Sequence, residues 1–185
     1  MNVLFLMANG FEETEFVTPF DYWQRGGLNV TLASISDSLD VVGAHGLAIK
    51  ANVLLGDLVT SGKLADFDAV CLPGGGPGVK NLKASTAVAE VLKSFDAAGK
   101  WIFAICAAPL VLSQAGLLKN RTCTCFPGCE VELDCKQFLT DRVVVDGNVI
   151  TSRGAGTAEE FAFECLAHAT DRATSEKIRN QVVAR

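Results

Sequence analysis

The chain has 185 residues, of which 49% are hydrophobic, and carries a net charge of −5 without a basic cluster. This length suits one domain with a sizeable core, spanning residues 1–185. The charge argues against a nucleic-acid-binding surface, and no apolar run approaches the length of a membrane span, so we expect neither nucleic acid nor membrane as a partner.

The cysteines point to a reducing compartment. Their number, seven, is odd, and the first residues show no basic segment or cleavage site, so we expect a cytoplasmic protein with reduced thiols. Four of them form a run that lacks both a Cys-x2-Cys pair and a histidine, which is unlike a zinc site. We therefore expect no metal but oxidisable loop thiols at Cys123, Cys125, Cys129 and Cys135.

Apolar runs and helical periodicity alternate along the first two thirds of the chain. Residues 3–8 form an apolar run that stops at Asn9-Gly10, as a buried parallel strand does. Phe16, Phe20 and Trp23 recur at helical spacing in the segment that follows. We expect strands at 28–35, 68–72 and 101–105, helices at 13–24 and 85–98, and a small antiparallel excursion at 41–55.

The last third begins with an irregular, cysteine-rich stretch at residues 121–139. A hairpin with a two-residue turn is expected over residues 143–151, followed by helices at 158–169 and 174–184. Strands that alternate with helices predict an α/β fold with a mainly parallel sheet covered on both faces.

Cys106 lies where the buried strand 101–105 turns into a helix that has Pro109 near its start. Ala104 and Ala108 are small residues on either side, as a tight nucleophile elbow requires. Backbone amides at the start of the helix favour a thiolate, so we predict a lowered pKa for Cys106. A buried core cysteine is the alternative.

Two further loops are expected beside Cys106, because ligands bind beyond the carboxyl ends of parallel strands. The glycine-rich segment 73–78 lacks a nucleotide-binding pattern and could bring an amide to the sulfur as part of an oxyanion hole. Glu15, one turn into the first helix, could point towards Cys106 and share a proton with it at a raised pKa. His45 and His168 lie in segments that do not favour a Cys–His dyad.

Four segments together resemble the DJ-one/ThiJ/PfpI superfamily, in its branch of small single-domain proteins. They are Asn9-Gly-Phe-Glu-Glu-Thr-Glu15, Leu72-Pro-Gly-Gly-Gly76, Ala104-Ile-Cys-Ala-Ala-Pro109 and Thr151-Ser-Arg-Gly-Ala-Gly-Thr157. The first is similar to the family's Gly-x-Glu-Glu-x-Glu signature, and the last differs from the family loop by alanine in place of proline. Phe126-Pro127 stands where some members have a histidine, and Ala107 excludes the peptidase-like pattern.

The resemblance implies a flavodoxin-like three-layer α/β/α sandwich and a cofactor-independent enzyme that acts on reactive dicarbonyls and glycation adducts, as a deglycase or glyoxalase does. It implies Cys106 as nucleophile, Glu15 as proton carrier, and the amides of Gly75 and Ala107 as oxyanion donors. The pocket it implies is formed by Gly74, Gly76, Phe126, Pro127, Arg153 and Gly154.

The resemblance also implies a homodimer, which would pair through the first helix and residues 41–55, with Tyr22 and Trp23 as possible contacts. Core burial is the alternative for Trp23. A redox sensor or chaperone that uses an oxidation-sensitive Cys106 is the rival function, since both roles need the same pocket. A role in a thiamine pathway or as a peptidase-like hydrolase is less expected.

Overall fold

The computed structural model describes residues 1–184, and its central feature is a sheet of seven strands. The strands are β1 (Asn2–Met7), β2 (Asn29–Ser34), β5 (Val53–Leu54), β6 (Ala69–Leu72), β7 (Trp101–Ile105), β10 (Val143–Asp146) and β11 (Val149–Ser152). Their order across the sheet is β10–β11–β7–β6–β1–β2–β5. Neighbouring strands run parallel except for the antiparallel pair of β10 and β11, so the predicted mainly parallel sheet is confirmed.

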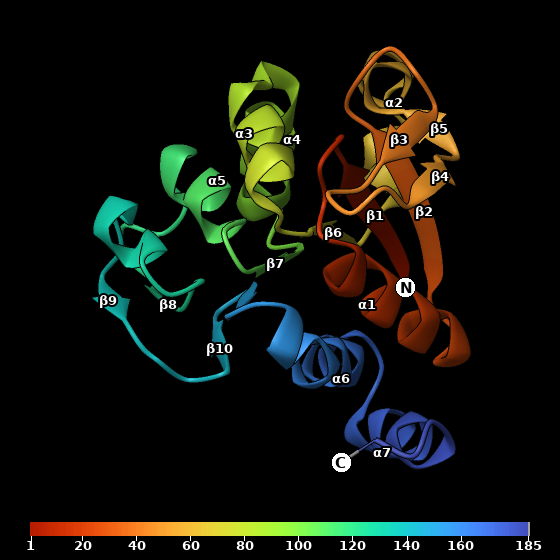
Figure 1. The fold of residues 1–185 in the computed structure, drawn as a ribbon, viewed down its shortest axis with the longest axis vertical. Coiled ribbons are helices and arrows are strands. Elements are labelled where there is room, and N and C mark those ends of the chain that lie inside the picture. The colour runs from red at the N-terminus through yellow and green to blue at the C-terminus, as the bar shows by residue number, and fades with distance from the viewer. Residues whose placement is uncertain (185) are drawn as a thin grey trace.

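Helices cover both faces of this sheet, as Figure 1 shows with the sheet seen between them. One face packs against α1 (Glu13–Arg25), α6 (Ala158–Ala169) and α7 (Arg172–Gln181). The other face packs against α2 (Leu55–Ser61), α3 (Gly76–Ala84), α4 (Thr86–Ala97) and α5 (Pro109–Gln114). The result is the three-layer α/β/α sandwich that the sequence predicts.

The two cores use alternate side chains of the same strands. In β1, Leu4 and Leu6 face the α2–α5 layer, whereas Phe5 and Met7 face the α1, α6 and α7 layer. Successive side chains of a strand point to opposite faces, so a strand covered on both sides must be apolar throughout. This is why its sequence is a continuous apolar run without alternation.

Trp23 belongs to the core and not to the surface. Its side chain is fully buried, and its indole Nε1 donates a hydrogen bond to the carbonyl oxygen of Ala162 on α6 at 2.9 Å. The neighbouring Tyr22 stacks on Phe163 and donates a hydrogen bond to Glu159. Of the two side chains suggested for an interface, Trp23 therefore packs α1 against α6 and is not available for contact with a second copy.

The excursion predicted over residues 41–55 is confirmed as an antiparallel hairpin of β3 (Asp40–Val42) and β4 (Ala48–Lys50), after which β5 joins the main sheet. Several segments differ from the prediction, among them residues 55–61, which form the unpredicted helix α2, and the last helix, which ends at Gln181. The glycine-rich segment continues into α3, and the stretch expected to be irregular contains β8 (Thr122–Cys123) paired in parallel with β9 (Gln137–Phe138). Short 3-10 turns complete the chain at η1 (Lys63–Asp66), η2 (Cys129–Glu132) and η3 (Ala155–Thr157).

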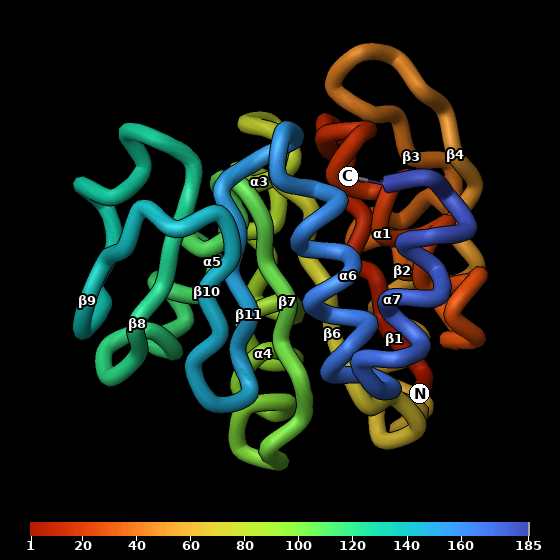
Figure 2. Tube along the Cα trace, turned by 90° about the horizontal axis from the view of Figure 1, so that it is seen from below, coloured from red at the N-terminus to blue at the C-terminus, as the bar shows by residue number. Residues whose placement is uncertain are grey.

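The parallel strands end at the same edge, which is uppermost in Figure 2. The loops that follow β1, β6 and β11 meet there with the end of β7. Within residues 1–184, the helices are all too short or too polar to cross a membrane.

Candidate active site

Cys106 occupies the turn between β7 and α5 in a backbone conformation that is rare for its residue type. Its φ is +66°, in the left-handed region that side chains with a Cβ disfavour. The turn is held from both sides, because the Cys106 amide donates to the carbonyl of Ser152 at 2.9 Å and its carbonyl accepts from the amide of Phe126 at 2.8 Å. The strained elbow predicted from the sequence is therefore present.

Glu15 is an ionisable side chain that is buried in the protein. It lies in the first turn of α1, and its exposure is only 1%. Oε2 accepts a hydrogen bond from the Gly74 amide at 2.8 Å, the Ala155 amide also bonds to the carboxyl group, and the carboxyl and the Cys106 thiol hydrogen-bond to each other. The structure thus brings Glu15 and Cys106, distant in sequence, into one pair.

Ala155 contributes a hydrogen bond to the Glu15 carboxyl that the sequence did not predict. It donates through its backbone amide, and a main-chain donor leaves no signature in the identity of a side chain. The same holds for the Ser152 carbonyl that anchors the elbow. Only the assembled loop after β11 reveals these two contacts.

The glycine-rich loop after β6 fits against this pair with no room for side chains. A Cβ at Gly74 would collide with the Glu15 carboxyl and with Cβ of Cys106, and would lie 3.0 Å from the Cys106 sulfur. Gly75 has a φ of +91° and faces the backbone of residues 10–12. The amide of Glu12 donates to the Gly74 carbonyl at 3.0 Å, so the loops after β1 and β6 form one wall of the site.

Burial and hydrogen bonding control the charge of this pair. Burial raises the pKa of Glu15 to about 7, although the hydrogen bonds from Cys106 and Gly74 oppose the shift. The pKa of the Cys106 thiol is also raised, first by burial and then by the nearby Glu15 carboxylate. The amides of Ala107 and Gly75 bond to the sulfur and lower the thiol pKa only in part.

The lowered pKa predicted for Cys106 is therefore wrong, while the raised pKa predicted for Glu15 is confirmed. The elbow amides are where the sequence suggests, but burial and the carboxylate outweigh them. Two anions in contact in a poorly solvated site disfavour each other, so the pair keeps at least one proton near neutral pH, mostly on the thiol. The thiolate is present when that proton sits on Glu15.

The raised pKa of Glu15 predicts a dependence of stability on pH. A carboxyl that binds its proton more tightly when folded stabilises the protein fully below pH 4.5 and loses that contribution as pH rises to about 7. At about 1.4 kcal/mol per pKa unit, the loss is at most about 3 kcal/mol. The free energies of unfolding of wild type and Glu15→Gln are measured with denaturant between pH 4.5 and 7.5. Wild type should lose up to this amount of stability relative to Glu15→Gln as the pH rises. Glu90→Gln, at an exposed site on α4, is the control, and its free energy of unfolding should depend on pH as that of wild type does.

The other predicted pocket residues border two hollows beside this pair. Phe126, Pro127, Arg153 and Gly154 line a cavity of about 320 Å³. Gly76 and Ala107 line a second cavity of about 330 Å³ on the side of α3 and α5. Gly74 lies between, against Glu15 and Cys106.

The histidines and the clustered cysteines lie apart from the pair. His45 Nδ1 contacts the Glu13 carboxylate at 2.7 Å, and His168 packs against Trp101 at the far end of β7. Among residues 1–184, the only group of side chains arranged to hold an ion is Glu12, Glu13 and His45, so the four clustered thiols do not converge on a metal. Glu13 already accepts hydrogen bonds from the His45 backbone and ring, which gives this group a structural role.

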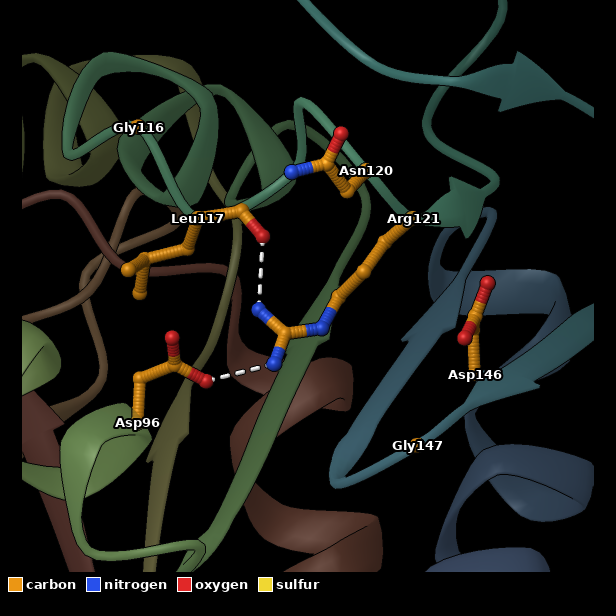
Figure 3. A pocket seen from close by; sticks show the side chains of 7 residues that line it. All are labelled: Asp96, Gly116, Leu117, Asn120, Arg121, Asp146 and Gly147. Carbon is orange, nitrogen blue, oxygen red and sulfur yellow. Dashed lines mark hydrogen bonds and ion pairs between the residues drawn. The ribbon is translucent and has the colours of Figure 1, made fainter.

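A cavity of about 440 Å³ opens at the opposite end of the sheet, near the turn between β10 and β11 (Figure 3). Arg121 crosses it and donates to the Leu117 carbonyl at 2.7 Å and to Asp96 at 2.6 Å. Asp146 accepts from the Thr122 amide at 2.7 Å. Arg121 and Asp146 thus already have hydrogen-bond partners within the protein. Their role is structural: they connect α4, the end of α5 and the hairpin of β10 and β11.

The fold and the site define a class of protein: a three-layer α/β/α sandwich with a cysteine elbow at the carboxyl edge of its sheet. A family model described as the DJ-1/PfpI family matches residues 1–168. The chain belongs to the DJ-1/PfpI family.

Individual relatives support this membership. The chain is 40% identical to the Parkinson disease protein 7 homolog of Danio rerio, over 86% of this chain and 84% of that protein. It is 30% identical to Deglycase PfpI of Pyrococcus furiosus, over 84% of this chain and 92% of that protein. To Protein DJ-1 homolog B of Arabidopsis thaliana it is 35% identical over 99% of this chain, which spans only 41% of that protein.

A solved structure has the same fold. Oxidized Toxoplasma gondii DJ-1 superposes on this chain with a TM-score of 0.93 at 31% identity, and the match covers 99% of this chain and 98% of that one. This agreement over nearly the whole of both chains confirms the predicted flavodoxin-like sandwich.

Proposed function

We propose that this chain is a cofactor-independent enzyme that converts reactive dicarbonyls such as methylglyoxal into hydroxy acids, with Cys106 as nucleophile and Glu15 as proton carrier. The observation that carries the proposal is the buried, hydrogen-bonded pair of a strained cysteine and a carboxyl with a pKa of about 7. A pKa near neutral suits a group that must both accept and donate a proton. The name of the Pyrococcus furiosus relative, a deglycase, agrees with this chemistry.

The first step is the addition of the Cys106 sulfur to the aldehyde carbon. The thiol proton moves to Glu15, a carbon–sulfur bond forms, and the carbonyl double bond becomes a single bond to oxygen. The amides of Gly75 and Ala107, which face the sulfur, stabilise the negative oxygen until Glu15 returns the proton. The product is a hemithioacetal, and no charge is left without a partner.

The second step moves a proton between the two carbons and then adds water. Glu15 removes the proton from the former aldehyde carbon to give an enediolate and delivers it to the neighbouring carbon, while the hydroxyl proton of the hemithioacetal moves to the neighbouring oxygen, so that the hemithioacetal becomes a thioester. Water attacks the thioester, the carbon–sulfur bond breaks, and Cys106 recovers its proton. The sum is one dicarbonyl and one water giving one hydroxy acid, so neither an oxidant nor a cofactor is required. From a hemiaminal adduct of the dicarbonyl, the sulfur would displace the amine, which leaves with the thiol proton, and the same rearrangement and hydrolysis would then give deglycase activity.

The test is the production of lactate from methylglyoxal by the purified protein. Lactate, measured enzymatically or by NMR, should accumulate in proportion to the methylglyoxal consumed and to the protein added. Loss of methylglyoxal without lactate would indicate mere trapping by lysine, arginine and cysteine side chains, and would reject the proposal.

Redox sensing or chaperoning is the second candidate, favoured by the access to Cys106. Only Cys106, Cys129 and Cys135 are partly accessible, while the other four thiols are buried. The amides of Ala107 and Gly75 and a protonated Glu15 are also suited to bind the oxygens of a sulfinate.

We expect Cys106 to be the first thiol oxidised by hydrogen peroxide, because it is partly accessible and the amides of Ala107 and Gly75 stabilise its thiolate. Peptide mass mapping after limited oxidation measures the order. First modification at Cys129 or Cys135 would instead assign the redox role to the cysteine-rich loop.

We further infer that the chain forms a homodimer through α1 and the β3–β4 hairpin. Val17 on α1, Val42 on β3 and Leu47 in the hairpin are each more than two fifths exposed, so these elements offer apolar side chains for an interface to cover. Light scattering at micromolar concentration should give a dimer mass, and Val17→Asp should shift it towards the monomer. A monomeric wild type would reject this interface.

A further inference from the structure

The cavity of about 320 Å³ between Phe126 and the loop after β11 shares its wall with the reactive pair. A Cβ placed at Gly154 would lie 3.3 Å from the Phe126 ring and 3.8 Å from Oε1 of Glu15. The Ala155 amide bonds to the Glu15 carboxyl, and the Phe126 amide donates to the Cys106 carbonyl. A molecule bound to Cys106 therefore has this cavity as one of its immediate surroundings.

Two arginines line the cavity, and only one of them has a counter-charge. Arg142 pairs with Glu160, with Nη2 at 2.7 Å from the carboxylate, and also donates to the carbonyl of Gly156. Arg153 forms no ion pair within residues 1–184, and its Nη1 is buried without a hydrogen-bond partner there. A buried guanidinium nitrogen without an acceptor is costly, and charged donors are normally satisfied in folded proteins. The cavity thus carries an uncompensated positive charge in a chain whose net charge is −5.

We propose that this cavity binds a carboxylate of the substrate and that Arg153 is the residue that selects it. Arginine presents a planar fork that matches a carboxylate, and such a group in the cavity would supply the counter-charge that Arg153 lacks. This inference rests on the proposed function, which it narrows to 2-oxoaldehydes that bear an anionic tail. The aldehyde reacts at Cys106 while the carboxylate lies against Arg153. An example is 4,5-dioxopentanoate, which with one water gives 2-hydroxyglutarate.

The binding test does not require turnover. Glutarate, which has the anionic groups but no aldehyde, is titrated into the protein and followed by NMR, with dimethyl glutarate as its neutral match. Wild type should bind glutarate in preference to the ester, and Arg153→Gln should weaken glutarate binding about tenfold or more, the loss expected for a charge-assisted hydrogen bond. Arg153→Lys, which keeps the charge but not the fork, should lie between. Arg172→Gln, which removes an arginine paired with Glu164 outside this cavity, is the control and should bind like wild type.

The turnover test compares 4,5-dioxopentanoate with its methyl ester. Wild type should show the higher kcat/KM for the anion, and Arg153→Gln should remove this preference while leaving kcat/KM for the ester nearly unchanged. Equal glutarate binding by wild type and Arg153→Gln, or an Arg153→Gln variant that still prefers the anion, would overturn the assignment of Arg153. Failure to turn over either compound would reject the proposed function alone, since the glutarate titration still decides whether Arg153 binds carboxylates.

Discussion

Cys106→Ala is expected to reduce lactate formation from methylglyoxal by a factor on the order of 10³ or more, to the level of the uncatalysed reaction. The substitution removes only the sulfur and leaves a Cβ, so the left-handed backbone at residue 106 is no more strained than before. The hydrogen bonds that hold the elbow, to Ser152 and from Phe126, use backbone atoms and are retained. A large loss of activity with little change in stability is therefore the expected pattern.

The matched control for this variant is Cys129→Ala. Cys129 is also a partly buried free thiol, and it lines the cavity on the Ala107 side of the site. It should keep activity within about twofold of wild type, because nothing in the proposed steps uses its sulfur. Substantial lactate formation by a folded Cys106→Ala protein would remove the nucleophile from the mechanism.

Glu15→Gln is expected to lower turnover by about 10²- to 10⁴-fold, the range that general acid–base groups contribute. Glutamine can still accept from the Gly74 amide and donate to the sulfur, so the site should keep its shape. It cannot carry a proton between the sulfur, oxygen and carbon atoms. Both addition and rearrangement should therefore slow, whereas the binding of substrate should change little.

The same substitution should change the reactivity of Cys106 in the opposite direction. The Glu15 carboxylate raises the pKa of the thiol, so its removal lowers that pKa and increases the thiolate fraction near neutral pH. Alkylation of Cys106 by iodoacetamide, followed against pH, should shift towards lower pH in Glu15→Gln while turnover falls. Glu15→Ala, which also leaves a cavity, should impair turnover and resistance to unfolding together. Near-normal turnover in both variants, with an unchanged alkylation profile, would show that Glu15 only stabilises the first turn of α1 and takes no part in the reaction.

Much of the fold can be predicted from local patterns in the sequence. Residues 101–105 are apolar throughout because β7 is covered on both faces, and the small residues around Cys106 with Pro109 behind it mark the elbow. The helix expected over 158–169 has those same bounds in the structure, since its apolar positions and the preceding turn define it from both sides.

Other elements depend on contacts that a local pattern does not contain. The helix α3 begins with Gly76-Pro77-Gly78, residues with poor helix propensity, and forms because Val79 and Leu82 pack into the core. The strands β8 and β9 have two residues each, too few to show a period. The raised pKa of Cys106 had the same origin: the sequence revealed the helix amides, but the burial of the thiol and the approach of Glu15 exist only in the folded chain.

The most direct measurement of the central claim is the intact mass of the protein during turnover of methylglyoxal, with rapid acid quenching and peptide mapping. The hemithioacetal and the thioester have the same composition, so both should add the mass of one methylglyoxal. We predict a transient adduct of this mass on Cys106 that disappears as the substrate is exhausted, and its accumulation in Glu15→Gln, in which the rearrangement of the adduct is slowed more than its formation. Lactate production with Cys106 unmodified at every time point, or an adduct confined to other residues, would contradict covalent catalysis by this cysteine.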